Sequence, residues 1–154
     1  MAEDRVMQEI SRGIEMLHAG ERDEARRTFD SIWLRIKDNA QPLHECTLAH
    51  FMADAQDDVT EELLWDLRAL DAALHATEAE AKAYHDSLSI AGFLPSLHLN
   101  LGDDYLRLGD LEACRKHVDA AMACSDALPD TPYAATIRGG IARLADRLRS
   151  RQTD

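Results

Sequence analysis

Two matching segments of the chain, residues 13–26 and 102–115, constrain its fold more than any other feature. In each segment two glycines stand seven residues apart, followed at the same steps by an acid, a second acid, a small residue and an arginine. A helix–turn–helix unit that recurs in this way indicates a repeat architecture. Such an architecture points to a binding scaffold rather than to a reaction.

The spacing of apolar residues predicts helices in most of the chain. Steps of three and four between apolar side chains are typical of helices, and no segment shows the sustained alternation of a strand. We expect one apolar stripe on the fourth helix, made of Leu63, Leu67, Leu70 and Leu74. Gly and Pro residues end most segments. The predicted helices span about 6–18, 22–37, 42–53, 60–74, 95–108, 111–122 and 132–148.

Residues 75–94 are less regular than the segments on either side. A short polar helix is predicted from Glu78 to about Leu88. Ala91 and Gly92 are expected to form a break, after which Pro95 would open the next helix. The irregular pattern therefore indicates that residues 75–94 are an insertion between the regular helical segments.

The charge of the chain argues against several classes of partner. Its formal net charge is −12, and residues 54–86 hold ten acids against two bases. Phosphate binding needs clustered Lys or Arg, so nucleic-acid binding is disfavoured. An anionic membrane surface would also repel most of this chain. Residues 131–154 are the exception, with five arginines and two aspartates.

The cysteines and the apolar runs indicate a cytoplasmic protein. Cys46, Cys114 and Cys124 are an odd number, and each lies in a helical pattern among apolar neighbours. We expect small core residues in a reducing compartment. The first residues lack a secretory pattern, and no apolar run is long enough to span a bilayer.

The third helix pair resembles the tetratricopeptide repeat, a unit of about 34 residues with the pattern Trp-x2-Leu-Gly-x2-Tyr, then Ala-x3-Phe, then Pro. Leu101, Gly102 and Tyr105 match it, Gly109 falls at the expected turn, and Ala121 fits a small position. The departures from the pattern are His98 for Trp, Cys114 for Ala and Val118 for Phe.

The first pair carries the same pattern less completely. Gly13, Gly20, Ala25 and Phe29 match it. Glu9, Arg12 and Met16 depart from it, and the second pair is degenerate, with Ala49 and Trp65 at two of its positions. The small residues would let the two helices of a pair approach closely.

The repeat length then gives the domain organisation. Gly13 and Gly102 are 89 residues apart, which is two repeats of about 34 residues with 21 left over. We expect one all-α, tetratricopeptide-like solenoid over residues 1–154, with three helix pairs and a C-terminal capping helix. Its parts are repeat 1 (about 6–39), repeat 2 (40–74), the insertion (75–94), repeat 3 (95–128) and the capping helix (131–149).

The resemblance implies that the protein binds a peptide or helix of another protein along a concave surface, lined by the first helix of each pair. The family's clamp for an acidic peptide C-terminus uses Lys, Arg and Asn, whereas this chain has mostly apolar residues there. An apolar helix or a basic, apolar peptide fits better. The expected lining set is Met7, Ile14, Leu43, Cys46, His50, Ser96, Leu99 and Asp103, with Ile10 beside it. Ile10, Ile14 and Leu99 are equally consistent with core positions.

Two other functions remain open. Self-association, for example as a homodimer, could pair the basic last helix with the acidic middle of a second copy. A small metal-binding or hydrolytic protein using His50 and Asp54 is a weaker alternative, since no tight ligand spacing occurs. We therefore expect no catalytic residue, no metal site and no cofactor.

Overall fold

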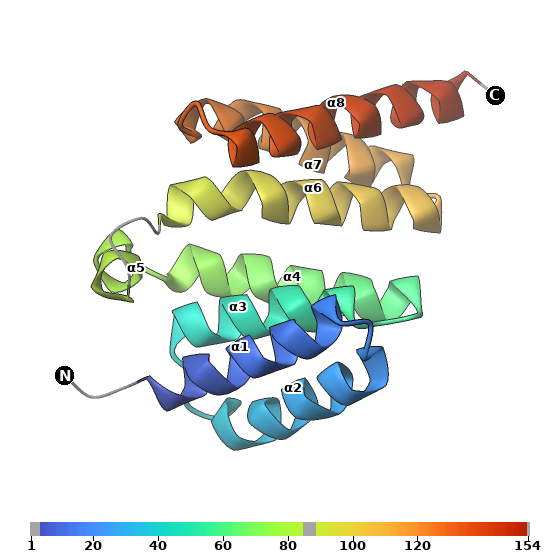
Figure 1. Cartoon of the computed structure of the whole chain (residues 1–154). Coiled ribbons are helices and arrows are strands. Elements are labelled where there is room, and N and C mark those ends of the chain that lie inside the picture. Colours follow the sequence, from blue (N-terminus) through green and yellow to red (C-terminus); the bar gives the residue numbers. More distant parts are fainter. Residues whose placement is uncertain (1–3, 85–88, 154) are drawn as a thin grey trace. The chain divides into compact units, whose positions relative to one another are not determined.

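The computed structural model describes residues 4–84 and 89–153, and every regular element in those ranges is helical. The helices follow one another along the chain without a strand between them in the described residues (Figure 1). They are α1 (Arg5–His18), α2 (Arg22–Ile36), α3 (Pro42–Asp54), α4 (Val59–His75), α5 (Glu78–Tyr84), α6 (Ile90–Leu108), α7 (Leu111–Cys124), the short 3-10 helix η1 (Ser125–Ala127) and α8 (Pro132–Gln152).

The chain divides into two compact units, Met1–Ala72 and Ala73–Asp154. We call them the N-terminal unit and the C-terminal unit. The boundary falls within α4, so α1, α2, α3 and most of α4 belong to the first, and α5 to α8 belong to the second.

In the N-terminal unit, α1 and α2 form an antiparallel hairpin against which α3 packs (Figure 1). Ile10 of α1 and Phe29 and Ile32 of α2 are almost completely buried, as their helical spacing predicts. The Asp4 side chain caps α1 by accepting a hydrogen bond of 3.0 Å from the Met7 N–H. The cap fixes the start of α1 next to α3.

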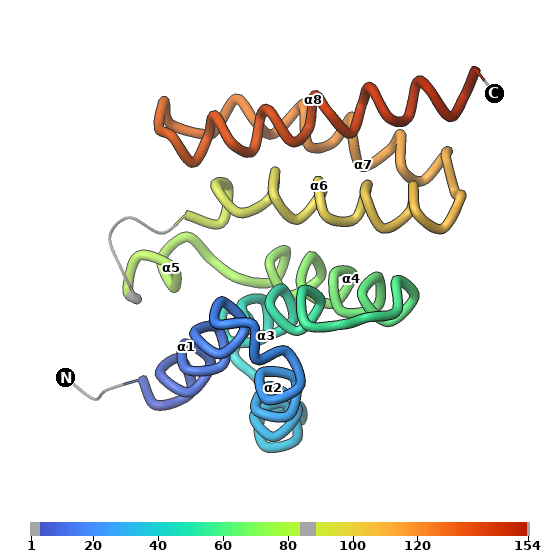
Figure 2. The backbone as a smooth tube through the Cα atoms, turned by 45° about the vertical axis from the view of Figure 1, so that its right-hand side comes forward, coloured from blue at the N-terminus to red at the C-terminus, as the bar shows by residue number. Residues whose placement is uncertain are grey.

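In the C-terminal unit, α6 and α7 form another hairpin, and α8 packs against both helices (Figure 2). We call α1–α2 the first hairpin and α6–α7 the third, after the predicted helix pairs to which they correspond. Its apolar core joins Leu106 of α6 and Cys114 and Val118 of α7 to Leu144 and Leu148 of α8. Thr131 caps α8 through its hydroxyl, which accepts a hydrogen bond of 3.2 Å from the Ala134 N–H. Thus α8 buries one side of the hairpin.

The turns of the two hairpins use the glycines of the repeated motif. Gly20 and Gly109 both have φ +84°, a left-handed conformation that L side chains rarely adopt. After each glycine, the next N–H closes the turn with a hydrogen bond of 2.9 Å, from Glu21 to Met16 O and from Asp110 to Tyr105 O. Glycine ends both helices for the same steric reason.

Two local expectations are wrong. The expected stripe on α4 is not its buried face, since Leu67 is 37% and Leu74 65% exposed while Ala69 and Ala73 are fully buried. A helix with small residues on one face and leucines on the other can bury either face, and tertiary packing decides which face is buried. The leucine spacing alone therefore misassigned the inner face of α4.

The expected break at Ala91-Gly92 is also wrong, because α6 begins at Ile90 and Pro95 lies inside it. The Ser89 hydroxyl accepts a hydrogen bond of 3.3 Å from Gly92 N–H, and the Glu78 carboxylate accepts one of 3.0 Å from Ala91 N–H. These two caps satisfy the first turn of α6. The expected end of the preceding helix, at about Leu88, lies outside the described residues.

Within the described part of the chain, none of the helices has the combination of length and apolar composition required to cross a bilayer.

Candidate partner-binding surfaces

The predicted lining residues of the N-terminal unit lie on α1 and α3, and their exposure differs. Met7, Leu43 and Cys46 are 5%, 7% and 4% exposed, whereas Ile14 and His50 are half-buried. Burial, reinforced by the charge of Glu45, raises the pKa of the Cys46 thiol to about 12. The Cys46 thiol is therefore protonated and unreactive at neutral pH. Because Ile14 and His50 are more exposed, a partner could reach them more readily than Met7, Leu43 and Cys46.

His50 and Asp54 stand one helical turn apart near the end of α3. The His50 ring meets Phe51 edge to face, with the ring centroids 4.8 Å apart. Burial lowers the pKa of His50 despite the opposing charge of Asp54, and loss of hydration raises the pKa of Asp54. Both shifts favour the neutral forms of the two side chains.

Asp4 and His44 hold α1 against α3. The Asp4 carboxylate that caps α1 lies 2.7 Å from Nε2 of the buried His44 in α3. Partial burial raises the pKa of Asp4, but the hydrogen bonds from His44 and from the Met7 N–H outweigh that effect and lower it. A charged carboxylate at the start of α1 also suits the helix dipole. This contact positions Met7 relative to Leu43.

Arg22 and Arg26, at the start of α2, hold the end of α3. The Arg22 guanidinium donates hydrogen bonds to Asp54 O (3.0 Å) and Gln56 O (2.9 Å), and it pairs with the Asp57 carboxylate at 3.1 Å. Arg26 donates to Ala55 O at 3.3 Å. These bonds satisfy carbonyls that the end of a helix leaves without partners, and they fix the part of α3 that carries His50.

In the C-terminal unit, the predicted lining residues lie on α6 and are all half-buried. Leu99 packs beside the core and against Gly140 of α8, where an added Cβ would lie 2.9 Å from Leu99 Cδ2. Asp103 pairs with Arg107 at 2.9 Å and with Arg147 at 2.8 Å. Leu99 and Asp103 are therefore engaged with α8, and Ser96 donates to Phe93 O.

Two exposed features were not found from the sequence. The helices α2 and α4 meet at Trp33 and Trp65, whose rings are edge to face at 5.7 Å, with the Arg68 guanidinium 4.6 Å and 4.5 Å from the two ring centroids. The exposed leucines of these helices in the N-terminal unit are Leu34 (67%), Leu64 (54%) and Leu67 (37%). For Leu64 and Leu67, the sequence signal is that α4 carries leucines on more than one face.

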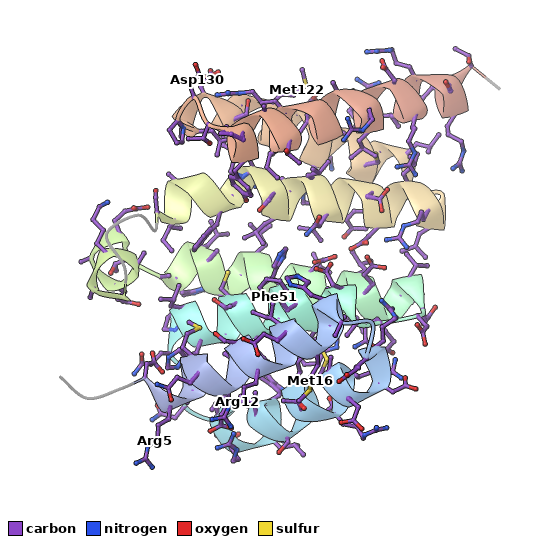
Figure 3. The ribbon with its side chains drawn as sticks, in the orientation of Figure 1. Arg5, Arg12, Met16, Phe51, Met122 and Asp130 are labelled. Atoms are coloured by element: carbon purple, nitrogen blue, oxygen red, sulfur yellow. The ribbon has the colours of Figure 1, made fainter. Side chains whose placement is uncertain are left out.

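The second feature is a hollow of about 250 Å³ in the C-terminal unit, beside α8. Met122 of α7, which is 54% exposed, lines this hollow and is labelled in Figure 3. Arg138 borders the hollow and donates to Ser125 O and Leu128 O, both at 3.1 Å. Ile141, Ala142 and Ala145 of α8 also line it.

These features define a class of protein: an all-α chain of helical hairpins with a tetratricopeptide-like fold. Solved structures of the protein PcrH share this fold. A crystal structure of PcrH in complex with the chaperone-binding region of PopD is 16% identical to this chain, covers 99% of it and 95% of PcrH, and has a TM-score of 0.63. The predicted fold class is thereby confirmed.

Two further PcrH structures are similar. The complex with the chaperone-binding region of PopB is 19% identical, covers 92% of this chain and 97% of PcrH, and has a TM-score of 0.60. PcrH from Pseudomonas aeruginosa is 18% identical, covers 99% and 95%, and has a TM-score of 0.54. No known protein-family profile matches the chain, and none of the curated proteins is similar in sequence.

Proposed function

We propose that this protein is a non-catalytic chaperone or adapter that binds a peptide segment of another protein. The observation that carries the proposal is the likeness to PcrH bound to a chaperone-binding region, which extends over 99% of this chain. Fold likeness is an analogy, so the proposal also needs a surface with suitable chemistry.

The proposed surface of the N-terminal unit is the part of the predicted lining set on α1 and α3. There the half-buried Ile14 and His50 would contact the partner, and the buried Met7 and Leu43 would support them. In the C-terminal unit, the half-buried Ser96 of α6 would be a separate contact. Apolar burial would supply most of the affinity. Since the chain carries a net charge of −12, a basic peptide would associate faster than an acidic one.

The proposal includes the assignment of the repeats and the cellular compartment in which the protein acts. Residues 6–39, 40–74 and 95–128 would be tetratricopeptide repeats, with an insertion at 75–94 and a cap at 131–149. The protein would need neither a cofactor nor a catalytic residue. Its three cysteines are free, which suits action in the reducing cytoplasm.

Self-association is a second candidate, favoured by the exposed leucines. Leu34, Leu64 and Leu67 are each at least 37% exposed on the N-terminal unit. A second copy of the chain could bury them in a symmetric interface. This candidate uses α2 and α4 rather than α1 and α3, so variants can separate it from peptide binding.

The test compares two matched variants as bait in a cell-lysate pull-down. One carries Ile14→Asp and His50→Asp on the proposed surface, and the other carries Leu64→Asp and Leu67→Asp. The bound segment would be mapped by proteolysis and titrated as a labelled peptide. We expect the lining variant to bind it more than about tenfold more weakly and the leucine variant to bind it as the natural chain does.

Light scattering distinguishes the alternatives. If the lining variant keeps its affinity and the leucine variant loses it, the proposed surface is wrong. If no partner is retained, while the natural chain is a dimer and the leucine variant a monomer, self-association replaces peptide binding. Helical circular dichroism of both variants controls for unfolding.

A further inference from the structure

Two histidine rings from different helices meet in the C-terminal unit. His98 of α6 and His117 of α7 approach with their Nδ1 atoms 3.0 Å apart, and the ring planes are tilted by 31°. One Nδ1 donates its proton to the lone pair of the other, since neutral imidazole has one donor and one acceptor nitrogen. The contact therefore brings two nitrogen ligand atoms to one point between the helices.

The surroundings of the pair restrain it and favour its neutral form. Tyr105 stacks on His117, with the ring planes within 10° of parallel and the centroids 5.5 Å apart. Burial lowers the pKa of both imidazoles, and the charge of His98 further lowers that of His117.

The spacing of the two nitrogens suits a chelate. Imidazole nitrogens lie about 2.0–2.1 Å from a bound transition ion, so two of them at 90–110° around the ion are about 2.9–3.4 Å apart. The observed separation of 3.0 Å falls within that range. A bound ion would replace the shared proton, and the rings would have to rotate so that both Nδ1 lone pairs point at it. Both side chains are half-buried, which leaves room for water as the remaining ligands.

We propose that His98 and His117 form a two-histidine site for a divalent first-row transition ion. Nitrogen ligands bind Cu²⁺ most tightly among these ions, with Ni²⁺ and Zn²⁺ weaker. The bound ion would link α6 to α7 within one hairpin. Sequence inspection finds no metal site here because the two ligands stand 19 residues apart, and His98 alone resembles an ordinary packed histidine.

The test uses the full chain and Cu²⁺ as the probe. Calorimetric titration would compare the natural chain with His98→Gln and His117→Gln, and with His18→Ala, which removes an exposed histidine on α1. Loss of one ligand should weaken binding by about a hundredfold, since the second imidazole binds intramolecularly. His18→Ala should leave the affinity unchanged.

A second measurement keeps the result independent of folding. Electron paramagnetic resonance of the Cu²⁺ complex should show hyperfine coupling to two imidazole nitrogens in the natural chain and to one fewer in either Gln variant. Equal affinity in the natural chain and both Gln variants would overturn the proposal. So would unchanged nitrogen coupling in variants whose helical signal is intact.

Discussion

The first and third helical hairpins have the same turn but pack their matching glycines against different partners. Gly20 and Gly109 share φ +84° and the same closing hydrogen bond of 2.9 Å. Gly13 makes room for Phe29 of its own partner helix, whereas Gly102 makes room for Leu144 of α8. The local motif thus fixes the turn, and the neighbouring helix determines what the small residue accommodates.

The side chains beside the turns show the same contrast. In the first hairpin the Thr28 hydroxyl contacts the Met16 sulfur at 3.4 Å, near the end of α1 (Figure 3). In the third, the equivalent residues are His117 and Tyr105, which stack as rings. Equivalent positions therefore touch in both hairpins, but only the third brings a pair of imidazoles together.

The largest expected difference between the hairpins concerns Phe29 and Val118. Both are buried at the same motif position. Phe29→Ala should lower the free energy of unfolding by about 3–5 kcal/mol and Val118→Ala by about 1–3 kcal/mol, because more apolar volume is lost from the first core. Urea unfolding followed by circular dichroism would measure both. Equal losses would contradict the difference in packing.

The motif glycines should respond unequally to a methyl group. An added Cβ at Gly13 would lie 2.3 Å from Phe29 Cε1, whereas at Gly102 it would lie 2.8 Å from the more flexible Leu144 Cδ2. Gly13→Ala should cost about 1–3 kcal/mol through overpacking, in excess of the roughly 1 kcal/mol gained in helix propensity. Gly102→Ala should cost less. Urea unfolding would contradict this expectation if Gly102→Ala lowered the free energy of unfolding more than Gly13→Ala does.

The turn glycines, in contrast, should respond equally. Nothing lies within 4 Å of an added Cβ at Gly20 or Gly109, so only the backbone conformation opposes a side chain. Gly20→Ala and Gly109→Ala should each cost about 1–2 kcal/mol. Thermal unfolding of the two variants would check the prediction. A difference much above 1 kcal/mol would mean that the turns are not equivalent.

The smallest expected difference is at the residues that follow the turns. Asp110 caps α7 by accepting a hydrogen bond of 3.1 Å from Ala113 N–H, while Glu21 makes no side-chain cap for α2. Asp110→Ala should cost about 1 kcal/mol, and Glu21→Ala only a few tenths. Hydrogen exchange at the first amides of each helix would detect the change. Comparable protection losses in both helices would refute the assignment.

Much of the fold follows from local signals in this chain. The two glycine turns, the Pro42 and Pro132 starts and the apolar steps predict most helices to within a few residues of their bounds. The start of α6 and the inner face of α4 were missed. The first depends on the Glu78 side chain from another helix, and the second on tertiary contacts of Ala69 and Ala73.

The candidate binding residues were less predictable than the helices. Their positions on the first helices of the hairpins follow from the motif, but burial of Met7, Leu43 and Cys46 does not. The meeting of His98 with His117, and of Trp33 with Trp65 and Arg68, joins residues far apart in the sequence. The lining set itself stays a prediction until a partner is titrated.

The sequence by itself determined where the chain turns, because a left-handed residue after a helix needs glycine whatever surrounds it. It also determined that the elements are helices, through apolar spacing and the small number of Gly and Pro residues in the chain. Only the tertiary structure decided which face of α4 is buried, what fills the space at Gly13 and Gly102, and which imidazoles meet. Those outcomes depend on side chains brought together by packing, and spacing along one helix carries no information about them.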